Sequence, residues 1–153
     1  MRRRVAAFDA GFRNFAFCIL DENKTSNPVA WRNLQLCSST NQVVAALHAW
    51  FDENHKLFAD VTHVVLERQM RSPFLEMNAI LWTLFRDRVV VVVHPSAVGA
   101  MFRLPRQREA KKKATVELVR NAVGNAFPPG AKQDDLADAW LLALYGLNLH
   151  FPK

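Results

Sequence analysis

The sequence predicts an α/β fold in which a mixed five-stranded sheet carries helices on both faces. Three short apolar segments joined by polar loops open the chain, and they predict an antiparallel meander. Two more apolar strands follow, separated by helical patterns, and strand–helix–strand units favour parallel pairing. Half of the 153 residues are hydrophobic, which is enough for a real core, so we expect a single domain over residues 1–153.

The meander is predicted over residues 5–9, 15–20 and 30–37. The first strand ends at Asp9-Ala10-Gly11, which is a turn signal. The third segment alternates between apolar and polar residues, as a half-buried strand does. Short polar loops between the three segments favour antiparallel neighbours.

Helical periodicity begins in the next segment, residues 41–54, where Val43, Leu47 and Trp50 share one face. Strands are predicted over residues 62–69 and 89–93, the second as a central strand of the sheet. A helix over residues 72–86, between them, is apolar nearly all round. Residues 73–85 are therefore either a core helix or the interface with a second subunit. A short helix over residues 96–102 and two more helices follow, the last starting near Asp134.

The chain is basic, with a net charge of +6 and a pI near 9.8, which suits a polyanionic partner such as nucleic acid. Positive charge is densest over residues 103–113, which we predict to form a loop between the last strand and a helix. Such a loop neutralises phosphates without reading bases, unless it is merely a solvated run of charge. The candidate DNA-binding residues in it are Arg106, Arg108, Lys111, Lys112 and Lys113.

Two acidic residues stand at the ends of predicted buried strands. Asp9 ends the first strand, and Glu67 follows the apolar run 64–66. If these strands are parallel neighbours, they lie about 4.8 Å apart. Two carboxylates that close repel each other unless a proton or a cation lies between them, and oxygen ligands suit Mg²⁺ or Mn²⁺.

The last helix adds Asp134, Asp135 and Asp138 near its start. Helical spacing places either Asp134 or Asp135 on the same face as Asp138, and it does not choose between them. Acidic residues in a first helical turn also occur simply because they stabilise the helix dipole. Carboxylates that converge from two strands and this helix are what two-metal phosphodiester hydrolysis requires.

Three segments together resemble the motifs of RuvC-like Holliday junction resolvases, in particular the poxvirus and fungal mitochondrial branch. The first segment, Asp9-Ala10-Gly11-Phe12-Arg13-Asn14, resembles an opening Asp-x-Gly-x-x-Asn motif. The second, Glu67-Arg68-Gln69-Met70-Arg71-Ser72, resembles a Glu-x-Gln-x-x-Arg motif. The third, Lys132-Gln133-Asp134-Asp135-Leu136-Ala137-Asp138-Ala139, resembles the closing Lys-x-Asp-Asp-x-Ala-Asp-Ala motif.

This resemblance implies an RNase H-like fold and a homodimer that nicks four-way DNA junctions symmetrically. It implies that Asp9, Glu67, Asp135 and Asp138 are the catalytic, metal-binding acids, so that Asp135 is selected over Asp134. It also implies two Mg²⁺ ions per active site, with Mn²⁺ as a substitute. Lys132 matches a basic position ahead of the last two acids that contacts phosphate. Arg71 matches a motif position that either binds DNA or supports the site structurally. Phe12 either wedges against bases or belongs to the core, and the second role is favoured.

Two other functions remain open at this point: a non-catalytic DNA-binding scaffold of the same fold, and an RNase H-like nuclease that acts on RNA–DNA hybrids or other branched DNA. No segment reaches the roughly 20 apolar residues that a membrane span needs. The basic start, Met1-Arg2-Arg3-Arg4, is followed too soon by Asp9 and Arg13 for a signal peptide. We expect an intracellular protein, either cytoplasmic at a site of viral replication or in an organelle matrix.

Overall fold

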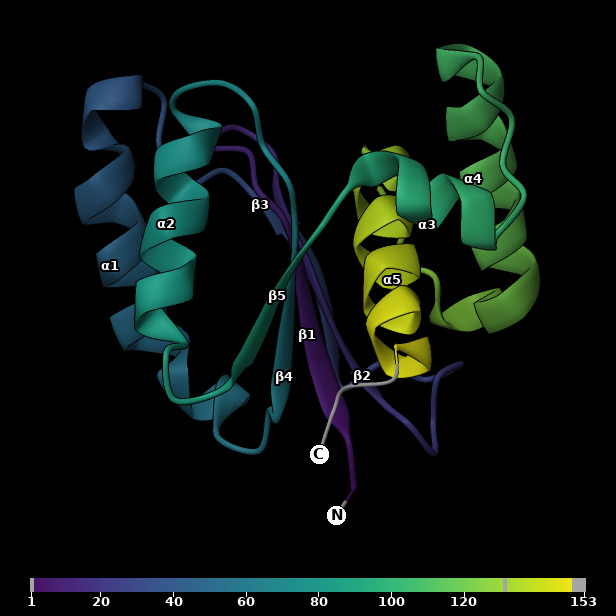
Figure 1. Ribbon diagram of the computed structural model, residues 1–153, viewed down its shortest axis with the longest axis horizontal. Coiled ribbons are helices and arrows are strands. Elements are labelled where there is room, and N and C mark those ends of the chain that lie inside the picture. Colours follow the sequence, from purple (N-terminus) through teal and green to yellow (C-terminus); the bar gives the residue numbers. More distant parts are fainter. Residues whose placement is uncertain (1, 131, 150–153) are drawn as a thin grey trace.

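A five-stranded mixed sheet forms the middle layer of the molecule (Figure 1). The computed structural model describes residues 2–130 and 132–149. The order of the strands is β3-β2-β1-β4-β5, so β1 lies at the centre. The antiparallel meander and the two parallel strands predicted from the sequence are both confirmed.

The strands are β1 (Arg4–Asp9), β2 (Phe15–Asp21), β3 (Ala30–Leu34), β4 (His63–Glu67) and β5 (Val89–Val93). β1 pairs antiparallel with β2, and β2 pairs antiparallel with β3. β1 pairs parallel with β4 in a register that sets Phe8 opposite Leu66, and β4 pairs parallel with β5. The next residues of the central pair, Asp9 and Glu67, are therefore the last residues of their strands and lie at the same edge of the sheet.

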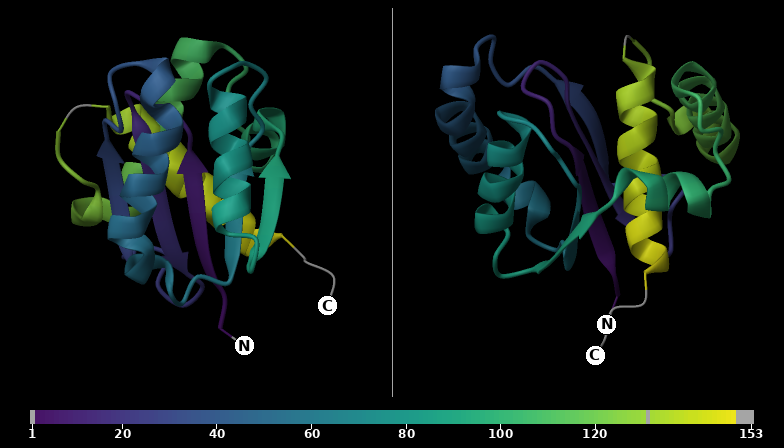
Figure 2. Two further views of the ribbon diagram at one scale, coloured as in Figure 1. Left: turned by 90° about the vertical axis from the view of Figure 1, so that its left-hand side faces the viewer. Right: turned by 45° about the horizontal axis from the view of Figure 1, so that its top comes forward.

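Helices cover both faces of the sheet, as predicted (Figure 2). One face carries α1 (Val43–Asn54) and α2 (Phe74–Leu84). The other carries α5 (Gln133–Asn148), with α3 (Pro95–Met101) and α4 (Arg108–Val123) beyond it. Three short 3₁₀ turns are η1 (Thr40–Gln42), η2 (His55–Phe58) and η3 (Gly124–Ala126). Within the described residues, no helix is both long enough and apolar enough to cross a membrane.

Strand alternation divides the core into two clusters. Ala6 and Phe8 of β1 face α1 and α2, whereas Val5 and Ala7 face α5. Aromatic rings fill the first cluster, where Phe8 contacts five others: Phe15, Phe17, Trp50, Phe58 and Phe85. Such ring contacts stabilise the core beyond the area they bury, so β1 is held firmly from this side.

α5 packs very closely on the sheet at Gly146. A Cβ added to this residue would lie 2.5 Å from Cγ2 of Val65 and 3.0 Å from Cγ1 of Val5. Both of these atoms belong to fully buried side chains on β4 and β1. Gly146 thus allows α5 to approach the two central strands closely, and the distance between the helix and the sheet depends on this glycine.

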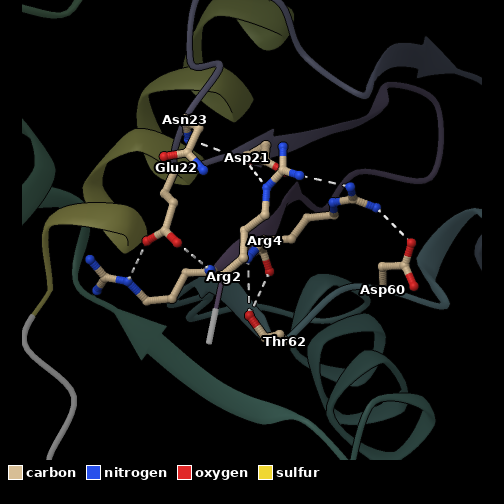
Figure 3. A network of polar contacts seen from close by, with 8 residues as sticks. Arg2, Arg4, Asp21, Glu22, Asn23, Asp60 and Thr62 are labelled. Carbon is tan, nitrogen blue, oxygen red and sulfur yellow. Dashed lines mark hydrogen bonds and ion pairs between the residues drawn. The ribbon is translucent and has the colours of Figure 1, made fainter.

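An arginine network ties the strand ends beside the N-terminus (Figure 3). Asp21, at the end of β2, accepts Nε of Arg2 at 2.7 Å and pairs with Nη2 of Arg4 at 3.4 Å. Arg4 also pairs with Asp60 at 3.0 Å. Burial acts to raise the pKa of Asp21, but hydrogen bonds from Arg2, the Asn23 N–H and Arg4 outweigh it and lower that pKa. This end of the sheet therefore has its charges paired.

Two sequence-based predictions about strands are wrong. The strand 89–93 was predicted as central, but β5 is an edge strand, and Val89 is 46% exposed. Its valine run is typical of a buried strand, but only one of its sides pairs, with β4. The third strand ends at Leu34 and not at residue 37. There the backbone turns to Phe12, whose carbonyl accepts the Leu36 and Cys37 N–H groups.

Two predictions about helices also need correction. The basic segment 103–113 is not one loop, because α4 begins at Arg108 and carries Lys111, Lys112 and Lys113. The core alternative for residues 73–85 is wrong for part of the helix: α2 buries Met77 and Leu81 but exposes Trp82 by 48%. A face of α2 is left without cover in the single chain.

Gly146→Ala tests the close approach of α5. The added methyl forces either α5 or the two valines to shift, and such overpacking costs roughly 1–3 kcal/mol. We expect the free energy of unfolding in urea to fall by about that amount. Gly99→Ala in α3 is the control, because its Cβ would meet only the flexible end of Lys111, at 3.7 Å, and we expect no loss of stability. Equal stability of Gly146→Ala and the parent protein would contradict this account.

Candidate active site

Asp9 and Glu67 both point to the α5 side of the sheet, because strand side chains alternate. Val5 and Ala7 of β1 face α5, and Asp9 follows them with the same period. Val65 of β4 also faces α5, and Glu67 is two residues further on. The carboxyl ends of two parallel neighbours thus present two carboxylates to the same helix.

α5 begins at the same end of the sheet, which is the upper end in Figure 1. Lys132 precedes the helix in a left-handed conformation, with φ of 60°. Asp134 and Asp135 lie in the first turn, and Asp138 comes one turn later, next to fully buried Ala137 and Ala139. The side chains brought together are those of Asp9, Glu67, Asp135 and Asp138, which are called the acidic cluster below.

The charge environment of Asp9 demonstrates this convergence. Burial raises the pKa of Asp9 well above its ordinary value, and the charges of four other acids raise it further: Asp138, Glu67, Asp135 and Asp134. Carboxylates act on one another in this way only when they lie close together with little water between them. The structure thus brings these acids to one end of the sheet, and their role as metal ligands stays a prediction.

The pKa values of Asp138 and Glu67 are also raised, with burial as the largest cause for both. Burial and then the charge of Glu67 raise the pKa of Asp138 to about 7. Burial likewise raises the pKa of Glu67. Lys111 of α4 opposes both shifts, and His94 opposes the second, so one ammonium group lies near both carboxylates. A pKa near neutrality at a clustered, half-buried acid is typical of a functional site.

Asp134 and Asp135 have different partners. Asp134 forms an ion pair with Nζ of Lys112 at 3.2 Å. Burial, then the charge of Asp134, raises the pKa of Asp135, while Lys132, the Asn33 side chain and Lys112 act to lower it. Nδ2 of Asn33 is buried on β3 and makes no hydrogen bond of good geometry. Asp134 is thus neutralised within the protein, and Asp135 is the carboxylate that remains available.

A cavity of about 500 Å³ opens onto these acids. Its lining joins Asp9, Glu67 and Asp135 to the loop after β1 and to Phe74 at the start of α2. Over residues 2–130 and 132–149, no three Asp, Glu, His or Cys side chains are placed as a ready group for holding a metal ion. Three acids of the cluster thus line one cavity, and Asp138, which is not among the lining residues, acts on Asp9 through its charge.

The basic candidates divide into two groups. Lys111 and Lys112 lie against the acids, as described above. The others are exposed: Arg71, Arg106, Arg108, Lys113 and Lys132. Arg106 shares a hollow of about 780 Å³ with His94 and Lys111, and Lys132 shares one of about 710 Å³ with Lys112 and Lys113. Both hollows adjoin the acidic end, so a band of positive charge flanks the cluster.

Lys111 is the residue whose position was not predicted from the sequence. Placing it in a loop hid its helical phase: Lys111, Thr115 and Val119 repeat every four residues, and the last two are buried. Extending the helical pattern back to Arg108 identifies Lys111 as inward-facing. Its Nζ would lie 3.7 Å from a Cβ on Gly99, which shows how closely the side chain passes over α3.

Solved structures with similar folds come from a virus and a bacterium. The Holliday junction resolvase of fowlpox virus superposes with a TM-score of 0.67 at 17% identity, covering 94% of this chain and 97% of the viral one. Its complex with Holliday junction DNA gives 0.66, also at 17% identity, covering 94% and 96%. RuvC of T. thermophilus, in complex with a Holliday junction substrate, gives 0.63 at 18% identity, covering 93% and 90%. These similarities confirm the RuvC-like, RNase H-like fold.

Sequence comparison gives the family. No curated protein matches the chain. The family described as Poxvirus A22 protein matches residues 3–148, a span that includes all three motifs and the whole acidic cluster. The poxvirus branch predicted from the motifs is thus confirmed, and the chain belongs to the poxvirus A22 protein family.

Proposed function

We propose that this protein is an endonuclease that resolves four-way DNA junctions by hydrolysing phosphodiester bonds with divalent metal ions. The observation that carries the proposal is the acidic cluster. Burial raises the pKa of all four carboxyl groups, the charges of the other three raise that of Asp9 further, and Asp9, Glu67 and Asp135 line one cavity. The fold relatives from fowlpox virus and T. thermophilus, solved with junction DNA, support the same substrate. Cations flanking the cluster suit a phosphate backbone.

The chemistry of the donors fits Mg²⁺, with Mn²⁺ as a substitute. All four ligands are carboxylate oxygens, which hard divalent cations prefer. Their raised pKa values record a repulsion that bound cations relieve. Asp9, Glu67, Asp135 and Asp138 would hold two ions, which supply activation of water and stabilisation of the leaving oxygen. Asp9, Glu67 and Asp135 already line one cavity, so rotation of their side chains would bring their oxygens toward one another.

The remaining residues orient the substrate. Lys111 limits the repulsion between Glu67 and Asp138, and it offers an ammonium group to the phosphate beside them. Five other basic residues are exposed and would bind phosphates further along the DNA arms: Arg71, Arg106, Arg108, Lys113 and Lys132. Lys112, paired with Asp134, holds α4 against the start of α5 and so steadies Asp135 and Asp138.

We further propose that the protein acts as a homodimer through the uncovered face of α2. Met70, Leu75 and Trp82 are 80%, 55% and 48% exposed, and they line a hollow of about 510 Å³ that reaches Val92 on β5. An apolar surface on a helix beside an edge strand is typical of an interface. A twofold pair of sites suits a junction, which offers two equivalent strands to cut.

Substituting the acids tests the catalytic assignment. Loss of residues that merely orient metal ligands costs about 10–100-fold, so Asp9→Asn, Glu67→Gln and Asp135→Asn should each lower the cleavage rate by at least roughly a hundredfold. Junction affinity should change only a few fold, because DNA binding depends mainly on the cations. Asp134→Asn is the matched comparison: it loses the ion pair with Lys112 but no proposed metal ligand, so it should lose much less activity than Asp135→Asn. The measurement is nicking of a labelled junction in saturating Mg²⁺, beside an RNA–DNA hybrid and a simple flap.

Full activity of Asp9→Asn or Glu67→Gln would refute the assignment. Loss of activity in Asp134→Asn with retention in Asp135→Asn would reverse the choice between these neighbours. Junction binding by the parent protein without any nicking would favour a scaffold, and preferential cutting of the hybrid would favour an RNase H-like activity.

The raised pKa of Asp138 predicts that this carboxyl group destabilises the metal-free protein at neutral and higher pH. A carboxyl group whose pKa is raised by folding binds its proton more tightly in the folded state, so stability falls as pH rises from about 4 to about 7. In EDTA at pH 8, Asp138→Asn removes one of the repelling charges and should stabilise the protein by about 2 kcal/mol. The gain should vanish near pH 4. Urea unfolding at both pH values measures it, and a variant less stable than the parent at pH 8 would contradict the prediction.

Charge on the apolar α2 face tests the dimer. Trp82→Glu should convert a dimer into a monomer of normal stability, because a carboxylate in an apolar interface is desolvated without a partner. Val44→Glu on α1, at a valine that is 54% exposed, is the matched control and should remain dimeric. Sedimentation equilibrium gives the masses. A dimeric Trp82→Glu protein would exclude this face as the interface.

A further inference from the structure

Two phenylalanine rings stack at the mouth of the cavity that contains the acids. Phe12, in the loop after β1, and Phe74, at the start of α2, have ring centroids 6.3 Å apart and planes inclined by 22°. The guanidinium carbon of Arg13 lies 5.6 Å from the centre of the Phe12 ring. Both rings are half-buried, whereas Arg13 is exposed. An exposed cation thus covers a ring that is held in place from beneath.

The loop that carries Phe12 is fixed on both sides. The Phe12 carbonyl accepts the N–H groups of Leu36 at 2.9 Å and Cys37 at 3.3 Å. Gly11 allows the tight turn, because a Cβ there would lie 2.8 Å from the Asn14 carbonyl oxygen. Phe12 and Phe74 also pack against the aromatic core cluster beneath them. A ring held this firmly loses little conformational entropy when a ligand stacks on it.

The position of the Phe12 ring and the charge of the protein indicate what kind of ligand stacks there. Phe12, Arg13 and Phe74 line the same cavity as Asp9, Glu67 and Asp135. Whatever stacks on Phe12 therefore lies beside the bond that is cut, on a chain of net charge +6. A flat, polar-edged group attached to a phosphate chain meets both conditions, and a nucleobase is such a group. Aromatic rings and arginine planes are the surfaces on which unpaired bases stack.

We propose that Phe12 is a stacking platform for one unpaired nucleobase of the substrate, next to the phosphate that is cut. The base occupies the ring face that Arg13 now covers, and Arg13 moves to the adjoining phosphate. This proposal rests on the proposed function and adds a preference to it: the site accepts DNA whose base is already unstacked, as at a point of strand exchange. Phe12 packs against the core, as favoured from the sequence, and the proposal adds base stacking as a second role.

A thermodynamic cycle tests the platform by pairing loss of the ring with loss of the base. Affinity is measured without divalent metal, for the parent protein and Phe12→Leu, with intact four-way junctions and with junctions that lack one base next to the exchange point. Leucine keeps the apolar packing and removes the aromatic face. Base stacking on an aromatic ring is worth about tenfold in affinity, so the parent should lose about that factor at one abasic position. Phe12→Leu should be about tenfold weaker on the intact junction and insensitive to the missing base.

Phe51→Leu is the matched control. Phe51 is also half-buried and packs on the same core cluster, but it lines the hollow between α1 and α2. This variant should respond to the missing base as the parent does, and thermal unfolding confirms that both variants are folded. The proposal is overturned if Phe12→Leu binds the intact junction within about twofold of the parent, or if the ring and base losses multiply at every position tested.

Failure of the proposed function has a different signature in the same titrations. A parent protein that binds duplex DNA as tightly as a junction, and cuts neither in Mg²⁺, contradicts the nuclease assignment. The coupling between the ring and the base is still read from the four affinities. A coupled loss supports the platform even then, and independent losses remove it while leaving junction cleavage intact.

Discussion

Burial of several carboxyl groups near one another is the constraint at the end of the sheet where β1 and β4 finish. Parallel pairing and side-chain alternation aim Asp9 and Glu67 at α5, and the helix returns Asp135 and Asp138 to the same space. Every one of these carboxyl groups has a raised pKa, and burial is the largest cause each time. Such an arrangement lowers the stability of the fold, and a bound ligand of opposite charge offsets that cost.

The two ends of the same sheet treat acidic residues in opposite ways. Asp21 is buried at the end of β2, where Arg2 and Arg4 bind both of its oxygens and lower its pKa. Asp9 is at the end of β1, where its neighbours are other acids and its pKa is raised. Arg2, Arg3 and Arg4 therefore pair with the acids at one end of the sheet, whereas at the other end neighbouring acids raise the pKa of Asp9. Lys111 acts on both Glu67 and Asp138.

Local patterns in the sequence predicted the parts of the site that depend on a single element. Asp9 and Glu67 follow apolar runs, so their place at strand ends, and the direction of the strands, could be predicted. Helical spacing could not choose between Asp134 and Asp135. That choice depends on an ion pair with Lys112, which lies on another helix, α4. The edge position of β5 also escaped prediction: five consecutive valines are equally compatible with a strand paired on one side or on two. Lys111 was placed in a loop because the start of α4 at Arg108 was not predicted.

The central claim is that the acidic cluster binds divalent cations, and a crystal grown with Mn²⁺ tests it most directly. Anomalous scattering locates manganese independently of any interpretation of the side chains. The account predicts two peaks, each within bonding distance of carboxylate oxygens from Asp9, Glu67, Asp135 or Asp138, with Asp134 still paired to Lys112. Manganese bound elsewhere on the protein, with no peak between β1, β4 and α5, would contradict it.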